Sequence, residues 1–71
     1  MDADHKQKLT ALLEYWIKHN EEHGEEFREW ADKAGALEGT DIRGELMQAC
    51  EEMGRVNALL LRALEKLEGR Q

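Results

Sequence analysis

The sequence predicts an all-α protein: a long antiparallel helical hairpin that dimerises into a four-helix bundle. Three observations support this prediction. The 71-residue chain contains no proline, and 37% of its residues are charged, mostly Glu, Lys and Arg, which favour helices. Its apolar residues recur at alternating steps of four and three on either side of a glycine-containing segment. A chain this short buries little apolar surface alone, so a partner or a covalent staple is expected.

The first helix is expected over about residues 4–34. Eight positions in it form an unbroken heptad seam. They are Leu9, Leu13, Trp16, Asn20, His23, Phe27, Trp30 and Ala34. Asp4 is expected to cap the first turn, because Gln7 follows it at the spacing of a capping box. Trp16 and Trp30 are interpreted as anchors of the hairpin core rather than as rings that stack on a ligand.

The second helix is expected over about residues 41–68, after a turn at 35–40. Its seam has the same spacing and consists of Ile42, Leu46, Ala49, Met53, Val56, Leu60, Ala63 and Leu67. Gly69 is expected to end this helix, since glycine readily adopts the left-handed conformation. Two helices of similar length joined by a short turn pack antiparallel, so the numbers of facing residues should add to about 76. This register brings Gly24 close to Gly54.

A second apolar stripe beside the seam predicts an interface. It includes Leu12, Ile17, Met47, Cys50, Leu61 and Leu64. Residues 1–71 form a single domain in this interpretation, so nothing else in the chain covers the stripe. We expect a homodimer with Leu12, Trp16, Ile17, Leu61 and Leu64 at its interface. The alternative occupant of the stripe is a helix of another protein.

His19 and His23 are the residues best placed to bind a ligand. One helical turn separates them, so both imidazoles lie on the same side of the helix, as in helical metal sites. Glu22 and Glu26 lie within a turn of the pair and can supply oxygen ligands. Zinc, nickel or copper would suit the imidazoles, and a dimer would bring two such pairs together. A transition-metal-binding protein is therefore one functional hypothesis.

The alternative interpretation of these polar residues is structural. Asn20 and His23 occupy seam positions, where a polar residue often fixes the register of two helices. In that case both would form hydrogen bonds across the hairpin, to Asn57 or Glu52.

A second possible metal site lies on the other helix. Met47, Cys50 and Met53 follow one another at helical spacing and offer sulfur ligands for copper(I) or zinc near His23 and Glu26. Methionine and cysteine at this spacing more often fill a core.

Several functional classes are disfavoured by composition. The net charge of -6 argues against nucleic acid and anionic membranes as partners, and no apolar run reaches transmembrane length. The acidic start does not resemble a signal peptide, so we expect a cytoplasmic protein. The single cysteine excludes an internal disulfide, and no nucleophile–base pair or phosphate-binding loop indicates an enzyme. We therefore expect no catalytic residues and no cofactor other than the possible metal ion.

The block from Trp16 to His23, with Phe27 and Trp30-Ala31 after it, resembles an uncharacterised group of short prokaryotic helical proteins and domains. Their pattern is Trp-x-x-His-Asn-x-x-His, followed by Phe or Tyr and by Trp-Ala, and it covers about the first half of this chain. The resemblance singles out Trp16, His19, Asn20, His23, Phe27 and Trp30, and it implies no reaction. The resemblance also implies another histidine at the position of Tyr15. This chain lacks that histidine, which weakens the metal hypothesis. The leading hypothesis is a non-catalytic structural or interaction module that self-associates.

Overall fold

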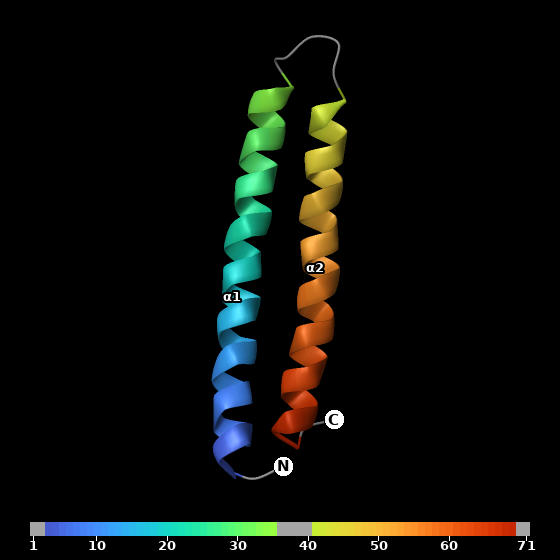
Figure 1. Cartoon of the computed structure of the whole chain (residues 1–71). Coiled ribbons are helices and arrows are strands. Elements are labelled where there is room, and N and C mark those ends of the chain that lie inside the picture. The colour runs from blue at the N-terminus through green and yellow to red at the C-terminus, as the bar shows by residue number, and fades with distance from the viewer. Residues whose placement is uncertain (1–2, 36–40, 70–71) are drawn as a thin grey trace.

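The computed structural model describes residues 3–35 and 41–69. They form two helices, α1 at Ala3–Ala34 and α2 at Ile42–Leu67, and no strand occurs among these residues. Figure 1 shows the two helices lying side by side and antiparallel. The predicted all-α helical hairpin is confirmed. The expected turn at 35–40 lies outside the described residues except for Gly35.

The two ends of α2 are defined by its own backbone. Gly69 has a φ of 83°, and its N–H donates to the carbonyl of Lys66 at 3.2 Å, so the prediction that Gly69 ends the helix is confirmed. Asp41 occupies the N-cap position, where its carbonyl accepts from the N–H of Glu45 at 3.3 Å. The predicted cap at Asp4 is wrong, because α1 already includes that residue and its carboxylate pairs with Lys8 at 3.6 Å.

Contacts between the helices fix the register of the hairpin. The side chain of Asn20 bonds to that of Asn57, and Gly24 lies opposite Met53. In both pairs the residue numbers add to 77, one more than the expected sum. The backbone geometry of the hairpin therefore follows closely from the spacing of its seam residues.

The core of the single hairpin is thin. The buried hydrophobic residues in the described part of the chain are Leu13, Ala31 and Ala34, all from α1, and Gly24 is buried beside them. No described residue of α2 is buried. Small residues at the contact let the helices approach closely. As a result, few large side chains are removed from water by the fold of one chain.

The prediction that Trp16 and Trp30 anchor this core is wrong. Trp16 is 39% exposed and Trp30 is 58% exposed. Each tryptophan directly precedes a residue that points toward α2, half-buried Ile17 and fully buried Ala31. Successive helix residues differ in direction by about 100°, so the two indole rings are turned away from α2 onto one flank of the hairpin.

Candidate functional site

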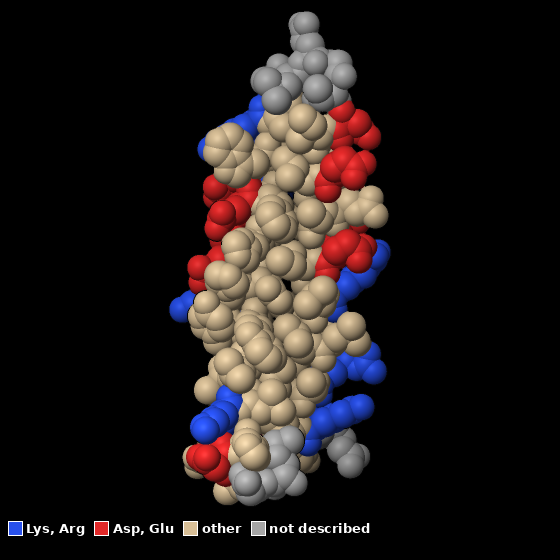
Figure 2. Space-filling model, in the orientation of Figure 1, with Lys and Arg blue, Asp and Glu red and all other residues tan. Residues whose placement is uncertain are grey.

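One long face of the hairpin gathers exposed apolar side chains. We call it the aromatic face and define it by Leu12, Trp16, His19, His23 and Trp30 of α1 with Ile42, Val56 and Leu59 of α2. Its six apolar members are between 39% and 60% exposed. Figure 2 shows an uncharged band along both helices, between charged margins. Neither helix, over its described residues, is long and apolar enough to cross a membrane.

The spacing of these residues places them on the same flank. Trp30 and Ile42 line one hollow together with Ala34 and Leu46, so α1 and α2 meet there on one side of the seam. Trp16 lies two heptads before Trp30, and Val56 lies two heptads after Ile42. Residues seven apart share nearly the same direction on a helix. The aromatic face therefore continues from the loop end toward the termini.

Four rings form a ladder along α1 at successive i, i+4 positions, and the middle two, His19 and His23, belong to this face. The ring centroids of Tyr15 and His19 are 5.3 Å apart and the rings are stacked. Those of His19 and His23 are 4.3 Å apart and edge-on. Phe27 stacks on His23 at 6.1 Å and is itself half-buried. The two imidazoles are thus held between a phenol ring and a phenyl ring.

Within the ladder, the two imidazoles point nitrogen to nitrogen. The Nε2 atoms of His19 and His23 are 2.9 Å apart, which is hydrogen-bonding distance. One ring must present its N–H and the other its lone pair for this contact to form. His19 is exposed and His23 is half-buried. The i, i+4 spacing has therefore brought together two of the four predicted metal ligands.

The two predicted carboxylate ligands do not complete a site within one chain. Glu22 lines a hollow with Tyr15, Lys18 and His19, and Glu26 is exposed one turn farther along α1. Across residues 3–35 and 41–69, no group of three or more His, Cys, Asp or Glu side chains is arranged to hold a metal ion. A metal site on one hairpin would have to rely on the histidine pair alone.

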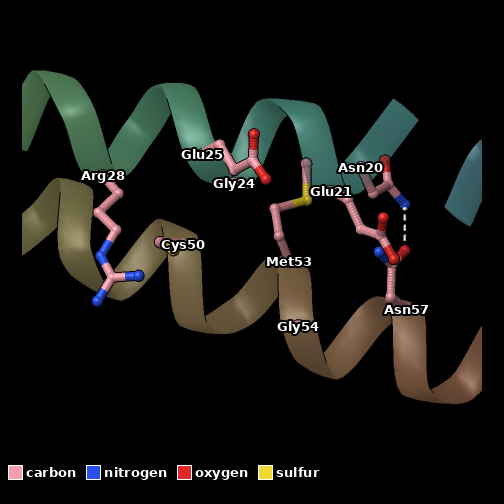
Figure 3. A pocket seen from close by; sticks show the side chains of 9 residues that line it. All are labelled: Asn20, Glu21, Gly24, Glu25, Arg28, Cys50, Met53, Gly54 and Asn57. Atoms are coloured by element: carbon pink, nitrogen blue, oxygen red, sulfur yellow. Dashed lines mark hydrogen bonds between the residues drawn. The ribbon is translucent and has the colours of Figure 1, made fainter. Parts of the chain in front are cut away.

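The opposite flank of the seam carries an open groove with a volume of about 270 Å³. It is lined by Asn20, Glu21, Gly24, Glu25, Arg28, Cys50, Met53, Gly54 and Asn57, and we call this flank the groove face. Figure 3 shows Arg28 extending from α1 toward α2 beside Cys50. Both glycines of the predicted Gly24–Gly54 pair line the groove, and the missing side chains help to open it.

Two asparagines close one end of this groove. Asn20 Nδ2 donates to Asn57 Oδ1 at 3.1 Å, and Asn57 Nδ2 donates to the carbonyl of Ile17 at 2.9 Å (Figure 3 shows the first bond). The structural interpretation of Asn20 is therefore confirmed, with Asn57 as its partner. His23 instead bonds to His19 on its own helix.

Comparison with known proteins gives a family for the chain. A family profile described as Domain of unknown function (DUF8180) matches residues 9–67. The chain belongs to this family. The matched range contains the ring ladder, the asparagine pair and the packed length of both helices. No curated protein and no solved structure matches the chain. The expectation of an uncharacterised domain is confirmed, and the functional argument rests on the geometry.

The five residues predicted at the dimer interface do not share one face of the hairpin. Leu12 and Trp16 lie on the aromatic face. Leu61 is 49% exposed and lies one heptad after Gly54, on the groove face. Ile17 and Leu64 are half-buried. Leu12 and Leu61 are thus similarly exposed leucines on opposite flanks, which makes them a matched pair for testing the interface.

The residues of the predicted sulfur site also lie on different flanks of the hairpin. Cys50 and Met53 line the groove beside Gly24, and Met47 is half-buried. His23 directly precedes Gly24, so its imidazole is turned about 100° away from the groove, onto the aromatic face. Histidine nitrogen and cysteine sulfur therefore lie on different flanks. The free thiol of Cys50 is half-buried.

Proposed function

We propose that this chain is a small, non-catalytic interaction module that self-associates. In the proposed dimer the aromatic face of one copy packs on the aromatic face of a second, giving a four-helix bundle. The main observation behind this proposal is the band of large apolar side chains that the described part of one chain leaves exposed, from Trp30 and Ile42 near the loop to Leu12 and Leu59. Tryptophan and leucine in contact with water on this scale are typical of an interface rather than of a free surface.

The accessible area of the chain supports a second copy as the occupant. The hairpin exposes 5677 Å². A compact monomer of 8.2 kDa is expected to expose about 4,500 Å², so the excess is roughly 1,100 Å². A standard protein interface removes about 800 Å² from each partner. Packing two aromatic faces together would remove an area of this size and give the bundle the core that one hairpin lacks.

Two further features favour an interaction module over an enzyme. The described part of the chain has no buried polar or charged side chain, whereas catalytic groups usually lie in a water-excluding pocket. The groove is open to solvent, and two of its lining residues, Asn20 and Asn57, are already bonded to each other across the helices. We also place the protein in the cytoplasm, where the free thiol of Cys50 would stay reduced.

Sedimentation equilibrium in the presence of a chelator tests the proposal. The expected mass is twice the 8.2 kDa of the chain at every concentration that gives a usable signal. A monomer that keeps its full helical circular dichroism would contradict the proposal. A monomer that becomes helical only with another protein would instead assign the aromatic face to a different partner.

A matched pair of variants tests which face is used. Leu12→Glu places a charge on the aromatic face and should give monomeric or unfolded chains. Leu61→Glu places the same charge on the groove face, at a leucine of similar exposure, and should leave the dimer intact. The reverse result, with only Leu61→Glu dissociating the dimer, would move the interface to the groove face.

A further inference from the structure

We infer that two copies of this chain together form one transition-metal site, to which each contributes His19 and His23. The inference rests on the proposed self-association, because one hairpin offers only two ligands. Three observations support it: the distribution of charge along the hairpin, the position of the histidines along α1, and the geometry of the pair.

Charge distribution determines how a second copy would lie. The half of the hairpin nearer the loop, residues 21–35 and 41–56, has ten acidic and four basic side chains. The half nearer the termini, residues 3–20 and 57–69, has four acidic and five basic ones. On the α2 margin of the uncharged band, acidic groups lie toward the loop and basic groups toward the termini (Figure 2). An arrangement with both loops at one end would place acidic margins together, whereas antiparallel copies place acidic margins beside basic ones.

Antiparallel copies would bring the two α1 helices together. Face-to-face packing about a two-fold axis that crosses the long axes sets each helix against its own equivalent in the second copy. A two-fold axis along the hairpins would set α1 against α2 instead. The charge distribution favours the first arrangement, in which a residue of α1 near the axis meets the same residue of the other copy.

His19 and His23 lie at the level where that axis is expected to pass. Helix α1 spans Ala3–Ala34, so its midpoint falls next to His19. Because facing residue numbers add to 77, α2 lies beside about residues 10–35 of α1, and the centre of that stretch falls next to His23. A dimer in which the two hairpins overlap fully therefore places the two histidine pairs opposite each other.

The geometry of the pair suits a metal ion. The two Nε2 atoms converge to 2.9 Å, while two imidazoles bound to one tetrahedral zinc ion have nitrogens about 3.3 Å apart. A small rotation of either ring closes this difference, and the donor ring must carry its proton on Nδ1 instead of Nε2 so that both Nε2 lone pairs are free for the metal. Stacking of Tyr15 on His19 and of Phe27 on His23 restricts both rings to this orientation. Two such pairs supply the four nitrogens of a complete tetrahedral shell, and imidazole favours zinc, nickel and copper.

Burial of the four imidazoles at the dimer interface is a further reason to expect a bound metal ion. In the proposed dimer the aromatic face would exclude water from four imidazoles. Within each chain their Nε2 atoms already bond to each other, so a metal ion would replace two such hydrogen bonds with four nitrogen–metal bonds. A shared metal ion would satisfy all four inward-facing nitrogens at once. Leucine at these two positions would bury more apolar surface, so the histidines weaken the interface unless they bind something.

Zinc titration of chelator-treated protein without a purification tag tests the inference. We expect one Zn²⁺ per two chains by isothermal titration calorimetry, and a tetrahedral absorption spectrum when Co²⁺ replaces it. His19→Gln and His23→Gln should each abolish this binding. His5→Gln, near the start of α1, should leave both stoichiometry and affinity unchanged. Circular dichroism and sedimentation in chelator show whether each variant remains folded and dimeric.

The outcomes separate the metal site from self-association. A dimer in chelator that binds no Zn²⁺, or binds one ion per chain, would overturn the shared site and leave the proposed function standing. A monomer in chelator would contradict the proposed function. If Zn²⁺ then drew the monomers into a dimer with one ion per two chains, the site would still be supported. Zinc binding that survives both His→Gln substitutions would also overturn it.

Discussion

Asn57 joins the two helices through both ends of its side-chain amide. Its oxygen accepts from Asn20, and its nitrogen donates to the carbonyl of Ile17, so a single residue of α2 holds two sites on α1. Both residues are half-buried, which makes an unpaired amide costly here. The pair also opposes axial sliding, because a shift of one turn would separate both bonds.

We expect Asn57→Leu to lower the free energy of unfolding by about 1–3 kcal/mol, because the Asn20 amide loses its partner inside the contact. The double variant Asn20→Leu/Asn57→Leu removes both polar groups and should recover most of this loss. Urea denaturation at one fixed protein concentration measures both. If the double variant is no more stable than the single one, the amide pair is not the source of the effect.

The histidine pair illustrates what sequence spacing can reveal at a single site. The i, i+4 interval was sufficient to predict that His19 and His23 meet, and they do. The same interval also places Tyr15 and Phe27 on either side of them. In the sequence, Tyr15 stands out only as the position of an absent histidine, through the resemblance, and the heptad spacing places Phe27 in the seam. Applying the same i, i+4 interval before His19 and after His23 would have predicted the ring ladder.

At the scale of the helices, the hairpin was predictable but the side that each helix turns to the other was not. Leu13 and Ala34 were placed in the seam and are buried. Between them the contact uses Gly24 and Ala31, whereas the predicted seam used the larger residues that precede them. A hydrophobic pattern assigns tryptophan rather than glycine to the contact between the helices. Close packing of two helices selects the smaller residue, so the large ones move to the flank.

The glycines give a prediction for α2. A Cβ atom added at Gly54 meets nothing within 4 Å, and the residue lies inside the helix. We expect Gly54→Ala to raise the free energy of unfolding by about 0.5–1 kcal/mol, since alanine is the better helix former. Thermal and urea denaturation measure the gain. Gly69→Ala is the opposite control: the φ of 83° strains any L side chain, so this variant should be destabilised.

Gly24 tests how closely the helices approach. A Cβ atom there would lie 3.7 Å from the Cβ of Met53, which is ordinary contact, so Gly24→Ala should be tolerated or mildly stabilising. Gly24→Leu adds atoms beyond a Cβ that already contacts Met53 and Cys50, so the side chain must fill the groove or displace α2, and we expect it to lower the free energy of unfolding by about 1–3 kcal/mol. Urea denaturation compares the two. Equal stability of both variants would mean that the groove accommodates the leucine side chain without displacing α2.

On the scale of the whole molecule, shape and charge point to the same assembly. The Cα trace measures 54 × 19 × 13 Å, so the hairpin is a long, thin object with much surface for its mass. Most of the exposed large apolar residues occupy one flank, with Leu61 on the other, and charge is divided between the two ends. The exposed apolar flank favours a second copy as its partner, and the division of charge favours an antiparallel orientation of that copy. The division of charge can be counted along the sequence, whereas the residues of the exposed flank depend on which side each helix turns to the other.

Spin labels can measure this direction. In a Cys50→Ala background, labels at Asp32→Cys lie near the loop end of α1, about 11 residues from the expected axis. At 1.5 Å per residue, antiparallel copies would separate the two labels by about 33 Å along the bundle, while copies with their loops together would leave them at the same level.

Labels at Glu22→Cys, beside the axis, should be close in either arrangement and serve as the control. Pulsed electron paramagnetic resonance of the chelator-treated dimer gives both distances. A short distance at both positions would show that the loops lie together, and it would remove the geometric basis for histidine pairs that meet at the centre.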